Sequence, residues 1–161
     1  MARWYLKGKK ITLHFEAIMG KAKVFVNGKL AAEHSGGYLP IIVDLTKAGI
    51  SFQKENVIAV LADNGDDPLY PPGKPQSVLD FCYFGGIYRD VWMVATNDVF
   101  ITNANAENKQ AGGGTFIHYE NVTETYADVI VETDIANTST LSKRLILSAE
   151  LKDENGNIAK Y

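Results

Sequence analysis

The stretch that decides the fold is AKVFVNGKLA, from Ala22 to Ala31. Its first half alternates Ala and Val with Lys and Phe, and this period of two is typical of a β-strand with one buried face. Asn27-Gly28 follows at once. An Asn-Gly pair between two such runs is a strong hairpin signal, because both turn residues need positive φ. We therefore expect a β-hairpin with its tip at Asn27-Gly28.

The same period recurs on both sides of this hairpin. Residues 11–15 alternate, residues 41–43 give a short strand, and residues 57–61 form a continuous apolar run that predicts a strand buried on both faces. Residues 87–94 alternate throughout, which predicts one further strand. Residues 44–49 are expected to form one helical turn that ends at glycine. Since no window carries a long helical period, we expect an all-β sandwich without a helix longer than a couple of turns.

Composition excludes several classes of protein. The 161 residues are 46% hydrophobic and 22% charged, which is normal for a soluble globular chain, and the net charge of -3 argues against electrostatic binding of nucleic acid. No apolar run approaches ~20 residues, so we expect no membrane span. The single Cys82 excludes an internal disulfide and a cysteine-based metal site. No metal site, cofactor or export signal is predicted, and the compartment stays open between cytoplasm and periplasm.

A long loop separates two of the predicted strands. It runs from Asp63 to Pro75 and holds four of the five prolines of the chain. Loops of this length inside compact domains are usually functional or flexible. Just beyond it, Asp80 is followed by the aromatic and cysteine stretch Phe81–Phe84 and then by Gly85-Gly86. Ordinary surface loops are mostly polar, so this apolar stretch is unusual for one.

The second half of the chain starts near Thr96-Asn97. Strands are expected at 116–119, 127–135 and 145–151, and Asn155-Gly156 predicts another hairpin turn, with a return strand that begins at Ile158. A sandwich domain usually needs about seven strands and ~100 residues, whereas this half offers about four strands. We therefore expect two domains, residues 1–96 and residues 97–161, and a chain that is a fragment cut inside its second domain.

Five segments, in order and spacing, resemble the N-terminal sugar-binding domain of glycoside hydrolase family 2. The segments are Val24–Lys29, Gly36–Tyr38, Val43–Thr46, Glu55–Val60 and Gly85–Val91. This resemblance covers most of residues 4–96 and implies a galactose-binding-like jelly roll. By position and strand pattern, residues 97–161 resemble the first half of the immunoglobulin-like domain that follows in the family. The expected fold is thus a jelly-roll β-sandwich followed by a partial immunoglobulin-like β-sandwich.

The resemblance also implies what this chain lacks. In the family, a (β/α)₈ barrel carries two glutamates that hydrolyse the glycoside, and such a barrel needs roughly 200 residues or more. We therefore expect no catalytic residue here and no hydrolysis by the chain alone. Its implied partners are a terminal β-galactoside and the barrel of a parent β-galactosidase, with glucuronate and mannose left open as the sugar. A free carbohydrate-binding module and a purely structural sandwich remain alternatives.

Three residues are candidates for contact with sugar. Asp80 stands six positions before Gly86, a spacing that resembles the family's aspartate that enters the barrel mouth and accepts hydrogen bonds from hydroxyls of the terminal sugar. The same resemblance implies that Phe81–Phe84 packs against the barrel. Alternatively, Asp80 caps a turn. Asn64 and Tyr83 are further candidates, although Asn64 also suits a plain turn.

Overall fold

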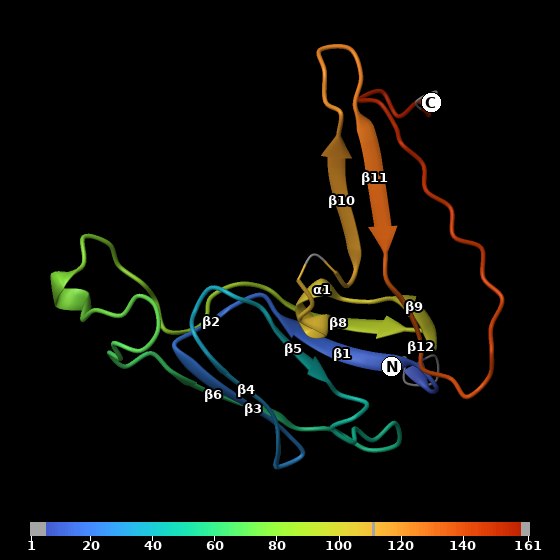
Figure 1. Cartoon of the computed structure of the whole chain (residues 1–161). Helices are drawn as coiled ribbons and strands as arrows, with labels where there is room; N and C mark the ends of the chain where they lie inside the picture. Colours follow the sequence, from blue (N-terminus) through green and yellow to red (C-terminus); the bar gives the residue numbers. More distant parts are fainter. Residues whose placement is uncertain (1–5, 111, 159–161) are drawn as a thin grey trace.

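The computed structural model describes residues 6–110 and 112–158, so the expectations for Trp4-Tyr5 and for residues 159–161 lie outside it. It is a two-layer β-sandwich from which a hairpin and the C-terminal segment project (Figure 1). One antiparallel layer has the order β5-β1-β8: β5 (Ile41–Asp44), β1 (Lys10–Phe15) and β8 (Val91–Thr96). The other has the order β4-β3-β6: β4 (Lys29–Ser35), β3 (Lys21–Val26) and β6 (Ile58–Asp63). A short pair adds β2 (Ile18–Met19) and β7 (Gly86–Ile87).

The predicted hairpin is confirmed. Strands β3 and β4 are antiparallel neighbours, and their connection places Asn27 at φ 50° and Gly28 at φ 80°. The expected helical turn after β5 is also present, because the amide of Ala48 donates to the carbonyl of Asp44. Among the described residues, none of the helices has the length or the apolar character to cross a membrane.

The core lies between the two layers. Every second residue of β1, β3 and β5 points inward, and short connecting segments add the rest, as alternation predicts. The cluster consists of Ile11, Phe15, Ile18, Ala22, Val24, Val26, Ile41, Val43 and Leu45. The expectation of an all-β sandwich is therefore confirmed.

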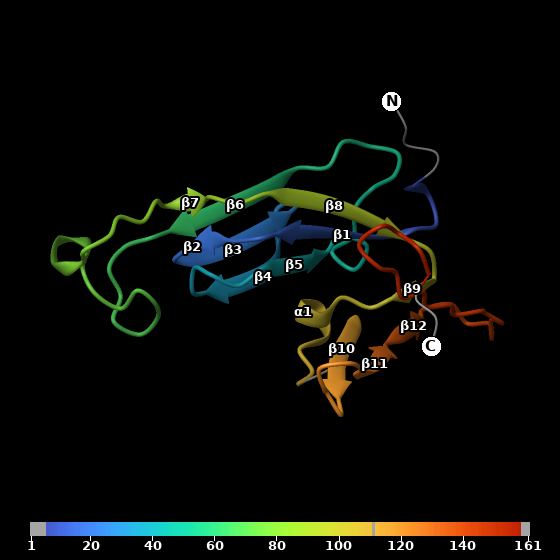
Figure 2. The same cartoon turned by 90° about the horizontal axis from the view of Figure 1, so that it is seen from above.

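The prediction that residues 57–61 are buried on both faces is wrong. Ile58 is 39% exposed and Leu61 is 57% exposed. The reason is that β6 and β8 are edge strands on the same side of the sandwich, whereas β4 and β5 close the opposite side (Figure 2). In the part of the chain that the structure describes, no element covers this open edge, so its apolar side chains meet solvent.

The single strand expected over residues 87–94 is divided in two. Residue 87 ends β7, which pairs with β2, and residue 91 begins β8, which pairs with β1 in another sheet. Between them the carbonyl of Asp90 accepts from the amide of Glu16, and the hydroxyl of Tyr88 donates to the carbonyl of Gly37. These bonds hold the chain in the crossing from one sheet to the other.

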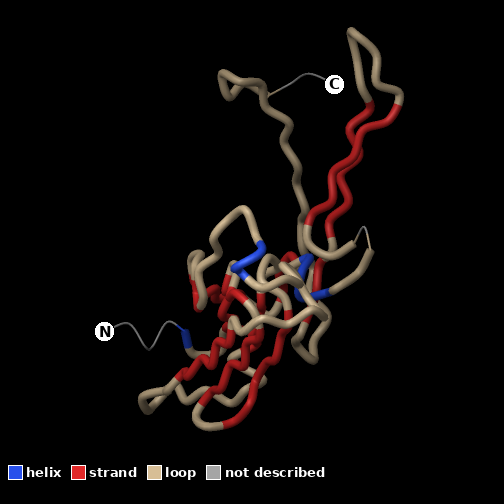
Figure 3. Tube along the Cα trace, turned by 90° about the vertical axis from the view of Figure 1, so that its left-hand side faces the viewer, coloured by secondary structure: helices blue, strands red, loops and turns tan. Residues whose placement is uncertain are grey.

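The second half forms less structure than expected. Its elements are β9 (Val99–Ile101), the single-turn helix α1 (Ala104–Glu107), β10 (Thr115–Glu120), β11 (Asp128–Thr133) and β12 (Ile135–Asn137). The strand expected at 145–151 does not form; this segment runs as an unpaired loop (Figure 3). A strand requires a hydrogen-bonded neighbour, and the described residues supply none for it. The turn at Asn155-Gly156 is present, with one bridge between Lys152 and Ile158.

Candidate functional site

All three candidate residues lie on the loop that connects β6 to β7, residues 64–85. This loop leaves one end of the sandwich and turns back through a single 3₁₀ turn, Gln76–Val78 (Figure 1). Asn64 directly follows β6, and Tyr83 lies three residues before β7. Asp80 lies farther out, on the returning limb. The sheet register therefore fixes both ends of the loop, as the pairings of β6 with β3 and of β7 with β2 require.

At the base of the loop, Asn64 packs against Gly85. A Cβ atom added at Gly85 would lie 2.6 Å from Oδ1 of Asn64, so a larger residue there would displace the Asn64 amide. The two neighbouring glycines have different roles: the backbone bends into β7 at Gly86, with φ 79°, and Gly85 allows the close approach of Asn64. Asn64 thus serves to close the loop.

Tyr83 also faces the base of the loop. Its hydroxyl donates to Oδ1 of Asp66 at 3.2 Å, which joins the outgoing limb to the returning limb. Burial, and then this carboxylate, raise the pKa of Tyr83. A small cavity of about 10 Å³ lies beside Asn64, Asp66, Tyr70 and Tyr83. This volume holds at most one water molecule, so the cavity is not a sugar pocket.

An ion pair that the sequence analysis missed attaches the loop to the sheet. Nζ of Lys21, at the start of β3, lies 2.8 Å from Oδ2 of Asp67. Oδ1 of the same carboxylate accepts from the amide of Leu69 at 2.9 Å. The hydrogen bond from Lys21 is the main cause that lowers the pKa of Asp67. The only hint in the sequence was an outward-facing lysine on a strand beside a loop rich in aspartate.

Asp80 differs from the other carboxylates of the loop. Asp63, Asp66 and Asp67 all take part in hydrogen bonds or ion pairs that shape the loop, whereas Asp80 is exposed and takes part in none of those bonds. Large apolar side chains of the same loop are also exposed: Leu69, Val78, Phe81 and Phe84. The structure therefore brings Asn64 and Tyr83 together at the base and leaves Asp80 on the outer part.

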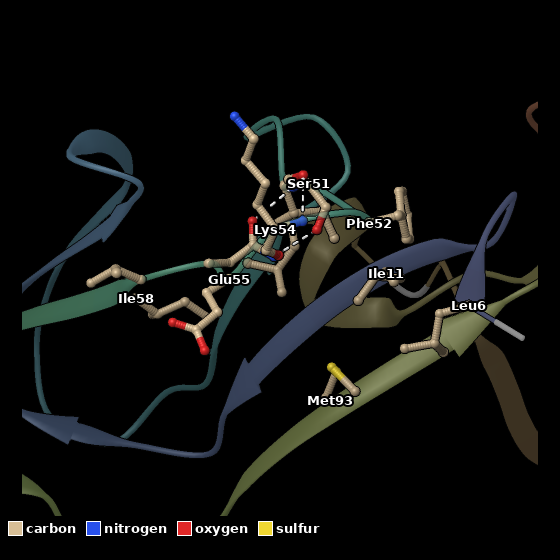
Figure 4. Close-up of a pocket in the computed structure, with 12 residues that line it drawn as sticks. Leu6, Ile11, Ser51, Phe52, Lys54, Glu55, Ile58 and Met93 are labelled. Carbon is tan, nitrogen blue, oxygen red and sulfur yellow. Dashed lines mark hydrogen bonds between the residues drawn. The ribbon is translucent and has the colours of Figure 1, made fainter. Parts of the chain in front are cut away.

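A larger cavity opens elsewhere, at the unpaired edge between β6 and β8. It has a volume of about 440 Å³, and Leu6, Ile11, Phe52 and Met93 give it an apolar wall (Figure 4). Figure 4 shows the Lys54 side chain pointing away from the cavity, and the Glu55 carboxylate, a single charged group, pointing toward it. None of the three candidate residues lines it. Its walls continue the hydrophobic core, so it is an opening of the sandwich rather than a site with convergent polar groups.

The chain is similar to known glycosidases. Residues 2–97 match the family model described as glycosyl hydrolases family 2, sugar binding domain. A "Beta-galactosidase" of Thermoanaerobacter pseudethanolicus is 43% identical over 95 residues, which cover 59% of this chain and 12% of that protein. A "Beta-glucuronidase" of Formosa agariphila is 31% identical over 159 residues, which cover 96% of this chain and 16% of that protein. The chain thus spans less than a fifth of the length of these relatives.

Solved structures agree with the sequence matches. A glycosyl hydrolase family 2 member from Bacteroides cellulosilyticus superposes with a TM-score of 0.76 at 27% identity, over 96% of this chain and 18% of that one. A putative β-galactosidase from Bacteroides fragilis gives a TM-score of 0.70 at 34% identity, over 84% of this chain and 19% of that one. The chain belongs to glycoside hydrolase family 2, and its sandwich matches the sugar-binding domain of that family.

Proposed function

We propose that this chain is the non-catalytic N-terminal part of a β-galactosidase, in which the loop of residues 64–85 completes the sugar site of a catalytic barrel. The observation that carries the proposal is Asp80, an exposed carboxylate on the outer part of a loop whose base is closely tied. In this role Asp80 accepts hydrogen bonds from hydroxyls of the terminal sugar. The resemblance of its spacing before Gly86 supports the same role.

The surroundings of Asp80 support a buried position in the complete enzyme. Phe84 is 78% exposed and Leu69 is 90% exposed, and several large exposed apolar side chains on one loop mark a surface that contacts another part of a protein. Packing of this loop against the barrel excludes water around Asp80. A carboxylate that accepts hydroxyl hydrogen bonds there contributes about 1.5–3 kcal/mol.

The charge of the loop favours a neutral sugar. Residues 63–85 include four aspartates and a single lysine, Lys74, and Lys21 of β3 pairs with one of these aspartates, so the loop keeps a net negative charge. A uronate carboxylate brought next to this loop meets like charge, whereas a galactoside presents only hydroxyl groups. We therefore propose terminal β-galactosides as substrates, although relatives of this chain include proteins named β-glucuronidase.

Hydrolysis itself is assigned to the barrel. A retaining mechanism needs an acid/base carboxylate and a nucleophilic carboxylate ~5–5.5 Å apart, and the described residues form a sandwich and small sheets rather than a barrel. The chain alone is therefore expected to release no aglycone from aryl β-galactosides. We further propose that the domain boundary lies near Thr96-Asn97 and that residues 97–161 begin an immunoglobulin-like domain; the end of the family match at residue 97 supports this boundary.

A hybrid enzyme tests the role of Asp80. In it, residues 2–97 of this chain replace the matched segment of the Thermoanaerobacter pseudethanolicus β-galactosidase. Asp80→Asn keeps the volume and removes the charge, so kcat/KM for an aryl β-galactoside should fall roughly tenfold to several-hundredfold. Asp80→Ala should be at least as damaging. Asp90→Asn, the same change at an exposed position beyond β7, is the matched control and should keep activity within about twofold.

The rival capping role gives the opposite result. Loss of a cap lowers the free energy of unfolding by about 1 kcal/mol and leaves kcat/KM nearly unchanged. Both quantities are therefore measured on each variant. Activity of Asp80→Ala close to that of the unmodified hybrid would eliminate the sugar contact.

A further inference from the structure

The base of the loop is a neck in which both limbs are tied to each other. The neck consists of residues 64–67 and 83–85. Asn64 packs on Gly85, and one step outward the hydroxyl of Tyr83 donates to Asp66. Beyond the neck lie residues 68–82, the tip, which includes Asp80. These contacts close the neck, but they leave open how the neck is oriented on the sandwich.

Lys21 supplies that orientation. Its backbone lies in the middle strand of the β4-β3-β6 sheet, opposite Ser35 on one side and Asp63 on the other. Its ammonium group reaches Asp67 at 2.8 Å and stands 5.6 Å from the centre of the Tyr70 ring. A rigid strand thus holds one end of the contact, and the neck holds the other.

The carboxylate of Asp67 is fixed on both oxygens. Oδ2 binds Lys21, Oδ1 accepts from the amide of Leu69, and only 18% of the side chain is exposed. Without Lys21, a carboxylate that is mostly shielded from water would lose its counter-charge, which costs more than loss of an exposed pair. The neck would then turn outward to hydrate Asp67. The pKa of Lys21 is raised, mainly by its hydrogen bond to Asp67, so both groups stay charged at neutral pH.

Lys23 provides a natural comparison on the same strand and the same face. Its Nζ lies 3.1 Å from Oε1 of Glu33, and both side chains are about half exposed. This pair joins two strands that the backbone ladder already joins. A surface pair of this kind contributes little to stability. The two lysines thus share residue type, strand and exposure, and they differ in whether the partner belongs to the loop.

We propose that Lys21 is a positioning residue for the sugar site: through Asp67 it sets the direction in which the neck carries Asp80. The inference rests on the proposed function of Asp80. A contact to a sugar hydroxyl tolerates only small displacements, so an anchor on a strand is more precise than a loop alone.

Amide hydrogen exchange on the full chain tests the anchor without any sugar. Lys21→Met should make residues 64–85 exchange about fivefold faster or more, and leave the β1, β3 and β5 amides protected. Lys23→Met should leave the loop unchanged. Lys21→Arg keeps the positive charge and should keep the loop amides as protected as in the unmodified chain. If the methionine variant acted only through altered packing, arginine would disturb the loop as well. Asp67→Asn is the second variant and should loosen the same residues. Equal loop exchange in Lys21→Met, Lys23→Met and the unmodified chain would overturn the anchor.

The hybrid enzyme then tests whether the anchor acts through Asp80. Lys21→Met should lower kcat/KM by about tenfold alone, and should add almost nothing in the Asp80→Asn background, because the contact is already lost. Full additivity of the two losses would overturn the positioning role while Asp80 keeps its own role. If Asp80→Ala is fully active, the proposed function fails, whatever Lys21 does to the loop.

Discussion

The two halves of the described chain differ in what they bury. Between residues 10 and 96 the buried side chains are apolar and come from both layers of the sandwich. Among the described residues from 97 to 158, the buried side chain is a polar one, Thr102, which is 7% exposed. Its hydroxyl accepts from the amide of Gly114 and donates to Oδ2 of Asp134, both at 2.8 Å.

These two kinds of interior order the chain in different ways. An apolar core gains free energy from each strand that packs on it, so its strands form and unfold together. A polar network gains little net free energy, but it fixes geometry where its partners are satisfied. In this chain the Thr102 network fixes the root of the β10–β11 hairpin, while the outer faces of the hairpin stay exposed. Stability should therefore reside in the sandwich.

The largest effect is expected from removing a core side chain. Phe15 is 2% exposed, so Phe15→Ala should lower the free energy of unfolding by about 3–5 kcal/mol. Phe116→Ala, at a 36% exposed position on β10, is the matched change in the other half and should cost less than about 1 kcal/mol. Urea unfolding followed by circular dichroism measures both. Similar losses in the two variants would show that the second half also contributes a core.

A smaller and local effect is expected from Thr102→Val. This change keeps the shape and leaves the buried amide of Gly114 without an acceptor, which costs about 1–3 kcal/mol. Amide exchange at Gly114 and along β10 should accelerate, while the urea midpoint of the sandwich stays the same. The exposed Thr138, whose hydroxyl donates to the carbonyl of Asp98, gives the control Thr138→Val, in which water replaces the lost bond. A fall in the sandwich midpoint with Thr102→Val would mean that the two halves unfold as one unit.

Much of the sandwich could be predicted because its signals are local. The alternation in β3 specifies a strand with one apolar face, and the Asn27-Gly28 pair specifies a tight turn. The core then forms because the apolar faces of the strands are buried against each other. The apolar run at 57–61 gave a wrong prediction of burial on both faces. The run shows only that the side chains are apolar, whereas the order of strands in the sheets decides whether another element covers them. The run at 145–151 misled for the same reason, since a strand depends on a neighbour.

The candidate site was less predictable. The spacing of Asp80 before Gly86 could be read from the sequence, yet the partner of each loop carboxylate could not. Lys21 and Asp67 are far apart in sequence, and nothing in residue type distinguishes Lys21 from Lys23. The Asn64–Gly85 contact likewise depends on where β6 and β7 bring the ends of the loop.

Two glycines, one in each half of the chain, test whether the halves unfold together, and a modest effect on stability is expected. Gly28 and Gly156 both have φ near 80°, and a Cβ atom at either would meet open space. Alanine at either position therefore suffers the same left-handed strain of about 1–2 kcal/mol. Gly28→Ala should lower the stability of the sandwich by that amount, because its hairpin belongs to the core. Gly156→Ala should loosen only its own turn and leave the urea midpoint of the sandwich unchanged. An equal shift of the urea midpoint in the two variants would show that the two halves of the chain unfold together.

The smallest expected effect is the response of the hairpin root to acid. The hydrogen bond from Thr102, and then the charge of Lys109 at 3.4 Å, hold the pKa of Asp134 below its ordinary value of 3.8. Glu107, which also contacts Lys109, is the other acid of the cluster. Since the pKa of Asp134 is lower when folded than when unfolded, its contribution is complete above the ordinary value and is lost as the pH falls through the folded value.

Acid should therefore separate the hairpin root from the sandwich core. The buried residues of the core do not titrate, whereas the hairpin root should weaken through Asp134, and the loop anchor through Asp67, as the pH falls below the ordinary value of 3.8. Nuclear magnetic resonance can follow the Gly114 amide and the Val24 amide through the same titration. The Gly114 amide should lose protection first, and Thr102→Val should weaken that pH dependence because it removes the main cause of the lowered pKa. If both amides lose protection at the same pH, the polar network does not order the hairpin independently of the core.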